Sequence, residues 1–185
     1  MAKNTAVFGI YRETTSLSSG LEMLRSAGFR STDVSVLMPE NLGTKDFVHT
    51  KETKAPEGAA TGAVSGAVIG GALGWLIGIG ALAIPGLGPF IAAGPILGML
   101  AGVGAGGTVG GVAGALIGLG VPEYEAKRYE GRVKAGGILL SVHCDDSTWV
   151  KRAKNILEQS GAEDVASSGE ASADYAVSDR PGTRI

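Results

Sequence analysis

The stretch Gly58-Ala-Ala-Thr-Gly-Ala-Val-Ser-Gly-Ala-Val-Ile-Gly70 begins a segment, residues 58–122, that contains no charged side chain. Glycine recurs there at every fourth position in two runs, which are Gly58, Gly62, Gly66, Gly70, Gly74 and Gly78, then Gly94, Gly98, Gly102, Gly106, Gly110, Gly114 and Gly118. Residues four apart lie on the same face of a helix, so each run would form a flat face without side chains. We therefore predict two helices, residues 59–84 and 91–119, joined by a turn that contains Pro85 and Pro89.

Helices so rich in glycine need a packing partner, because each interior glycine costs roughly 1 kcal/mol relative to alanine. A flat glycine face lets another helix approach backbone to backbone, as in small-xxx-small packing within membranes. The glycines expected to make this glycine-zipper contact are Gly62, Gly66, Gly70, Gly74, Gly78, Gly98, Gly102, Gly106, Gly110 and Gly114. Between them stand mainly Ala, Val, Leu and Ile, which are not typical of a flexible linker.

The composition of this helical hairpin does not decide whether lipid or protein surrounds it. Both helices exceed the roughly 20 residues that a membrane span needs, but their glycine- and alanine-rich halves are weakly hydrophobic. We favour a lipid bilayer, with a water-soluble assembly of mutually buried hairpins and a monomeric soluble domain as alternatives. Lysine and arginine flank the hairpin and are absent from its apex, which predicts that both termini face the cytoplasm.

The segments on either side of the hairpin predict two β-α-β units. Strands are expected at residues 5–11, 34–38, 137–143 and 162–166, and helices at residues 14–27, 122–135 and, capped by Asp145, Asp146 or Ser147, up to Ser160. This order predicts an α+β fold, a ferredoxin-like sandwich split by the inserted glycine-rich hairpin. The expected organisation is residues 1–39 as the first half, 40–57 as a polar linker, 58–121 as the hairpin, 122–166 as the second half and 167–185 as a disordered tail.

Composition and motifs argue against catalysis and nucleic-acid binding. The net charge of −2 is not that of a nucleic-acid-binding protein, and the single Cys144 excludes an internal disulfide. The group His143-Cys144-Asp145-Asp146 could ligate a metal, but adjacent strand residues point to opposite faces, so we interpret it as a strand end with helix caps. We expect no catalytic residue, metal, cofactor or small-molecule substrate.

One segment resembles a known family. The pattern G-[IV]-P-x-x-x-A-x-x-[YF], followed by a spaced valine and glycine, is matched by Gly120, Val121, Pro122, Ala126, Tyr129, Val133 and Gly136. It is similar to that of the bacterial general stress and low-temperature-induced proteins, as are the opening strand, the hairpin and residues 161–165. This resemblance implies a stress-linked protein without a defined enzymatic activity. A more distant similarity is to the small two-helix membrane subunit of alternative complex III.

The resulting hypothesis is a non-enzymatic stress protein that self-assembles through its glycine faces, in or on the cytoplasmic membrane. Its expected partners are further copies of the chain and membrane lipid. The alternatives are a water-soluble self-assembling particle or filament with buried hairpins, a pore, and an accessory subunit of a membrane complex.

Overall fold

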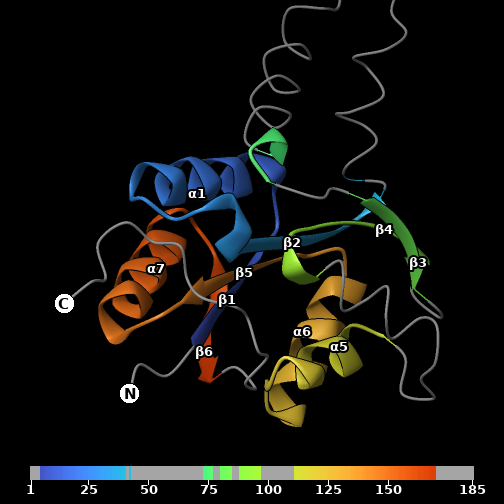
Figure 1. Ribbon diagram of the computed structural model, residues 1–185. Coiled ribbons are helices and arrows are strands. Elements are labelled where there is room, and N and C mark those ends of the chain that lie inside the picture. Colours follow the sequence, from blue (N-terminus) through green and yellow to red (C-terminus); the bar gives the residue numbers. More distant parts are fainter. Residues whose placement is uncertain are drawn as a thin grey trace, which may run out of the picture.

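A computed structural model describes residues 5–40, 42, 73–76, 80–84, 88–96 and 111–169 of the chain (Figure 1). The elements, in order, are β1 Thr5–Tyr11, α1 Thr14–Ser26, the 3-10 turn η1 Ser31–Asp33, β2 Val34–Pro39, β3 Gly80–Ile84, β4 Gly88–Ala93, α5 Val112–Gly118, α6 Glu123–Lys134, β5 Ile138–Cys144, α7 Ser147–Gln159 and β6 Glu163–Gly169. The α+β class predicted from the sequence is confirmed.

The six strands form one sheet in the order β3-β4-β2-β5-β1-β6, and every neighbouring pair is antiparallel. The interior strands β2, β5 and β1 are joined in regular register, with Val7 opposite Val142 and Val36 opposite Leu140. Helices α1 and α7 cover one face of this sheet, and α5 and α6 cover the other (Figure 1). Both faces of the interior strands β1, β2 and β5 are therefore largely removed from water, as the apolar runs of β1 and β5 require.

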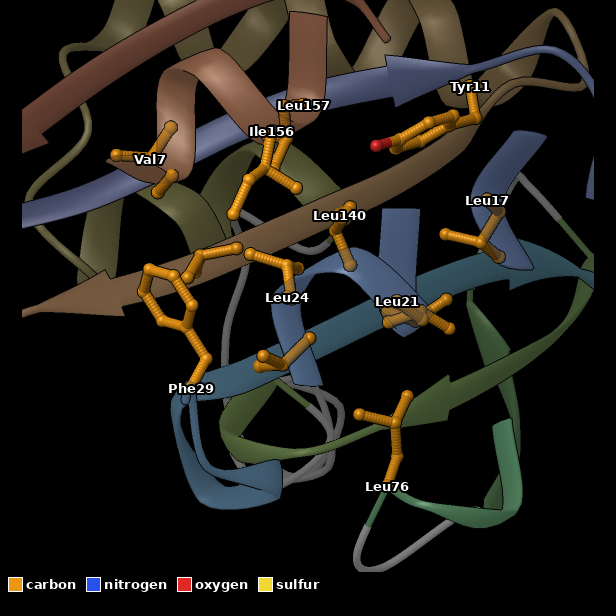
Figure 2. Packing of buried hydrophobic residues seen from close by; sticks show 14 of the residues in the cluster. Val7, Tyr11, Leu17, Leu21, Leu24, Phe29, Leu76, Leu140, Ile156 and Leu157 are labelled. Atoms are coloured by element: carbon orange, nitrogen blue, oxygen red, sulfur yellow. The ribbon is translucent and has the colours of Figure 1, made fainter. Parts of the chain in front are cut away.

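The face under α1 and α7 is the larger of two apolar layers. Alternate strand residues point to it, among them Val7 and Leu140, which are both 0% exposed. Three leucines at helical spacing in α1 pack against them, together with Ile156 and Leu157 of α7 (Figure 2). Leu76, from the short described segment 73–76, joins the same cluster.

The opposite face is covered by a pair of shorter helices. The stripe of α6 consists of Ala126, Tyr129 and Val133, all at most 1% exposed. Val112 and Leu116 of α5 belong to the same cluster, as do Phe8, Leu37 and Leu139 from the sheet. The rings of Phe8 and Tyr129 lie 5.7 Å apart between centroids, so α6 is seated directly on β1.

The structure corrects the prediction for the apex of the hairpin. Residues 80–84 and 88–93 form the strands β3 and β4, which pair with each other from Gly80 opposite Ala92 to Ile84 opposite Gly88. β4 in turn pairs with β2, from Val36 opposite Ala93 to Pro39 opposite Phe90. The expected helical turn is thus a β-ribbon that extends the sheet. An open edge of β2 and the helix-breaking prolines nearby explain why strand pairing prevails over the four-residue glycine period.

Gly94 shows how the second glycine run departs from a helix. It follows β4 with a φ of +77°, and a Cβ built there would lie 2.2 Å from the carbonyl oxygen of Val34. The absence of a side chain at Gly94 therefore allows the backbone to pass close to β2. Within the predicted helix 91–119, the structure describes one longer helical piece, α5.

In the part of the chain that the structure describes, no helix is long and apolar enough to cross a membrane. The β-ribbon at residues 80–93 corrects the predicted transmembrane helical hairpin at its apex, and nothing in the described residues supports the hairpin or its glycine zipper. Residues 43–72 and 97–110, where most of that hairpin was predicted, lie outside the described residues.

Candidate functional site

Two ion pairs and a hydrogen bond join α6 to the edge strand β6. The carboxylate of Asp164 pairs with Arg128 through Oδ1 and with Arg132 through Oδ2, both at 2.8 Å. The two arginines are four residues apart and so share one face of α6. Between them, the hydroxyl of Tyr129 donates a hydrogen bond of 2.9 Å to the backbone oxygen of Asp164. We call these four residues the Asp164 clamp.

The backbone under the clamp is irregular. Asp164 has a φ of +54°, which makes it the only non-glycine residue with positive φ among those described. Opposite it, the pairing of β1 with β6 shifts register, from Phe8 opposite Ala166 to Ile10 opposite Glu163. Such a bulge bends an edge strand and interrupts its row of hydrogen-bonding groups. Aspartate tolerates the left-handed conformation better than most side chains, and the clamp holds it in place.

The opposite edge of the sheet is different. β3 reads Gly80-Ala-Leu-Ala-Ile84 and contains neither a charged residue nor a proline. Its pairing with β4 is regular over all five residues. Within the part of the chain that the structure describes, β3 pairs on one side only, so the sheet ends there in an uncharged strand.

The glycines predicted to pack helices are placed only in part. Gly74 is exposed, and a Cβ built on it would meet nothing within 4 Å. Gly114 lies in α5 and is partly exposed. The others lie outside the described residues: Gly62, Gly66, Gly70, Gly78, Gly98, Gly102, Gly106 and Gly110. Their role in packing stays a prediction.

The group at His143 to Asp146 is used for structure. Nε2 of His143 lies 3.1 Å from Oδ1 of Asp145, while Cys144 is buried under α1 and α7. Asp146 caps α7 by accepting from the backbone N–H groups of Thr148 and Trp149 at 2.8 and 3.0 Å. No cluster of three or more potential metal ligands occurs among the residues whose placement is described. The helix cap expected in this group is therefore confirmed at Asp146.

Sequence reasoning missed the Asp164 clamp and the β3 edge. The four-residue spacing of Arg128 and Arg132 was a usable signal for a shared helix face, but their acceptor lies more than thirty positions away along the chain. For β3, the short apolar run between Gly80 and Pro85 was a signal for a strand, but the glycine period outweighed it.

These features define an α+β domain whose sheet has one clamped edge and, at the other end of the described strands, one plain, uncharged edge. Residues 5–167 match the family described as "Alternative complex III, ActD subunit". The chain therefore belongs to the ActD family, named for a subunit of a membrane respiratory complex. No curated protein and no solved structure matches the chain.

The family corrects several predictions. The resemblance to general stress and low-temperature-induced proteins is wrong, and so is the role in stress. The sequence pattern behind this resemblance includes Ala126, Tyr129 and Val133, which form the buried stripe of α6. The pattern therefore reflects the packing of a helix on the sheet and does not indicate a function. The more distant similarity named the right complex.

Partners and location change accordingly. The prediction that the chain associates with further copies of itself is wrong, because a subunit of this complex has the other subunits as its partners. A membrane location agrees broadly with the family, since alternative complex III is membrane-associated. The orientation of the termini stays a prediction.

Proposed function

We propose that this chain is a non-catalytic accessory subunit of alternative complex III, which binds other subunits through its α+β domain. The observation that carries this proposal is the family match over residues 5–167, which spans both halves of the sheet and the segment between them. A match of this extent favours a role of the whole domain over a role of one short motif.

The contacts of its polar side chains support a non-catalytic role. Asp146 is engaged as a helix cap, and Asp164 is engaged by two arginines. Both carboxylates thus stabilise local structure. The domain contributes shape and contact surface, and the reaction of the complex belongs to other subunits.

The fold can also be proposed in finer terms. Leaving out the ribbon, the strands stand in the order β2-β5-β1-β6, with α1 and α7 on one face. This arrangement supports a ferredoxin-like core made of two β-α-β halves. On this proposal β3, β4 and α5 are additions supplied by the inserted segment, and α6 leads back from it into the core.

The test is to purify the complex through a tag on this chain, co-expressed with the other subunits. We expect those subunits in a fixed ratio, and we expect a complex prepared without the chain to keep its turnover while its yield falls. An untagged preparation is the control for non-specific retention. Recovery of the chain alone, or a complex without turnover in its absence, would contradict an accessory role.

A further inference from the structure

We propose that the outer side of α6 binds an acidic segment of another subunit. This side, which we call the outer α6 face, consists of Tyr124, Lys127, Arg128, Gly131 and Arg132. The partner comes from the same complex, so the inference rests on the proposed function. It goes further by naming the surface that makes the contact and the chemistry of the segment that it binds.

The buried stripe of α6 determines which residues face out. Ala126, Tyr129 and Val133 pack on the sheet, so the opposite side of the helix faces water. Tyr124 and Gly131 are seven residues apart and lie along the middle of that side. The structure describes the whole of α6, and every residue of the outer α6 face is exposed.

Two residues of this face suit contact with another chain. The ring of Tyr124 stands in water, with 78% of the residue exposed, and tyrosine and arginine are enriched at protein interfaces. Gly131 lies in the interior of the helix, where glycine lowers helix stability relative to alanine. A Cβ built there would meet nothing within 4 Å, so packing within the domain does not require this glycine. A partner that approaches the helix closely beside Tyr124 accounts for both residues.

The charges of the outer α6 face predict the chemistry of that partner. The side chains of Arg128 and Arg132 are 41% and 46% exposed, whereas that of Asp164, with which both pair, is 21% exposed. At the end of the helix, Lys134 is 52% exposed and its partner Glu130 is 17% exposed. In these pairs the cation lies further out than the carboxylate, so an approaching segment meets positive charge first. An acidic segment is therefore complementary to this face.

Both arginines keep hydrogen-bond donors for such a segment. Arg128 meets Asp164 through one terminal nitrogen, and Arg132 meets it through Nε. A guanidinium has five N–H groups, so a carboxylate of the partner can bind the others while the Asp164 clamp stays in place. Lys127 and its partner Glu123 are equally exposed, so we expect the arginines to carry the preference for carboxylates.

The packing of α6 favours a protein over a lipid surface as the partner. A helix that lies on a membrane inserts an apolar face between the lipids. The apolar stripe of α6 is buried against the sheet, and the outer α6 face has one large ring, that of Tyr124. A protein segment can use the ring, the flat position at Gly131 and the arginines together.

Cysteine labelling tests whether the face is covered in the complex. The natural Cys144 is buried, so Gly131→Cys supplies the accessible thiol. We expect a maleimide to react with it at least about tenfold more slowly in the purified complex than in the isolated chain. Asn155→Cys, at an exposed position of α7, is the control and should keep its rate. Equal rates for Gly131→Cys in both samples, or no reaction in the isolated chain, would overturn the inference.

Charge reversal tests whether the partner is acidic. Lys127→Glu changes the charge beside the arginines without touching the Asp164 clamp, and we expect it to lower recovery of the other subunits at least about tenfold. Lys151→Glu makes the same change at an exposed position of α7 and should recover them as the wild type does. Unfolding curves of the isolated variants check that both are folded.

The outcomes separate the two proposals. Equal recovery with Lys127→Glu and Lys151→Glu overturns the acidic partner, and the accessory role stands. If Lys127→Glu keeps the complex but loses binding to vesicles of anionic phospholipid, the face meets lipid headgroups, and again this inference alone is overturned. A wild-type chain that recovers no other subunit overturns this inference and the accessory role together.

Discussion

The two faces of the sheet are covered by helix pairs that are fixed in different ways. Each face has one fully buried tyrosine whose hydroxyl reaches a neighbouring element: Tyr11 under α1 and α7, and Tyr129 under α5 and α6. On the first face the bond is between neutral groups within the apolar layer. On the second, the bond stands beside ion pairs at the surface.

The first face is closed tightly around its hydrogen bond. The hydroxyl of Tyr11 lies 2.7 Å from Oγ of Ser160, at the end of α7. Gly20 of α1 leaves room for this bond, since a Cβ built there would come within 2.5 Å of the hydroxyl oxygen. The helix pair is therefore held mainly by shape and by dispersion contacts, and one exposed hydrogen bond of 3.3 Å, from Arg152 of α7 to the carbonyl oxygen of Ala27, joins the two helices at the surface.

The second face combines packing with charge. Tyr129 anchors α6 to the backbone of Asp164, while the side chains of Arg128 and Arg132 are 41% and 46% exposed. Ions in solution can screen these pairs. The comparison shows that one domain uses a mainly apolar attachment on one face and an attachment with two partly exposed ion pairs on the other, so the stabilities of the two faces should respond differently to salt and to mutation.

The largest effect is expected from truncating one leucine on each face. Leu139 and Leu140 are neighbours on β5, both are 0% exposed, and they belong to opposite layers. We expect Leu139→Ala and Leu140→Ala each to lower the free energy of unfolding by about 2–5 kcal/mol, measured by urea denaturation. Hydrogen exchange should then rise mainly in α5 and α6 for Leu139→Ala, and mainly in α1 and α7 for Leu140→Ala.

Tyr124→Ala is the control for this pair, because its side chain is 78% exposed. It should change the free energy of unfolding by less than about 0.5 kcal/mol. Equal exchange in all four helices after either leucine substitution would show that the two layers unfold as one unit, and the comparison between faces would fail.

A smaller effect is expected at high pH, where the two tyrosines report on the dryness of their faces. Burial raises the pKa of Tyr11 to about 12, against a lesser opposing effect of the hydrogen bond with Ser160. Burial likewise raises the pKa of Tyr129 to about 12, with Arg128 acting in the opposite direction. Because the folded chain holds the phenol proton more tightly than the unfolded chain does, each tyrosine contributes its full share to the free energy of unfolding below pH 10. That contribution is lost between pH 10 and 12, by about 1.4 kcal/mol per pH unit for each tyrosine.

The phenylalanine variants isolate each contribution. Tyr11→Phe and Tyr129→Phe should each be less stable than the wild type at pH 8, by about 1 kcal/mol for the lost hydrogen bond. Near pH 12 each should be the more stable protein, because it has no phenol to ionise. Unfolding curves at both pH values check this reversal, and an unchanged ranking would mean that the hydroxyl is solvated in the folded chain.

Much of this architecture could be predicted from local patterns. The spacing of Ala126, Tyr129 and Val133 predicts a helix with one buried face, and all three are buried. Asp146 stands directly before an apolar helical stripe, so its capping role could be predicted among the three candidates. These features depend on residues within a turn or two of each other, which a sequence displays directly.

The ribbon and the clamp could not be predicted in the same way. The sequence of β4 allows a strand, but the partner that selects it is β2, which pairs Val36 with Ala93 from far away in the chain. The four-residue glycine period was a local signal, and long-range pairing overruled it. The conformation of Asp164 likewise depends on where α6 lies over β6, which becomes known only when the sheet is assembled.

The smallest effect, and the sharpest test of the charged face, is expected at Asp164. Asp164→Asn keeps a side chain that tolerates positive φ and removes only the charge, so we expect a loss of about 0.5–1 kcal/mol that largely disappears in 1 M salt. Asp164→Ala adds a backbone penalty of about 1 kcal/mol that salt cannot screen.

Glu163→Gln is the matched control for these two variants. Glu163 adjoins Asp164 on β6 and pairs with Arg12, whose side chain is 72% exposed, so its loss should cost less than about 0.5 kcal/mol. Denaturation at low and high salt separates the three variants. If Asp164→Asn loses no more than Glu163→Gln at low salt, the two arginines contribute nothing measurable. Tyr129 and apolar packing would then hold α6 in place, and the two faces would be fixed by the same means.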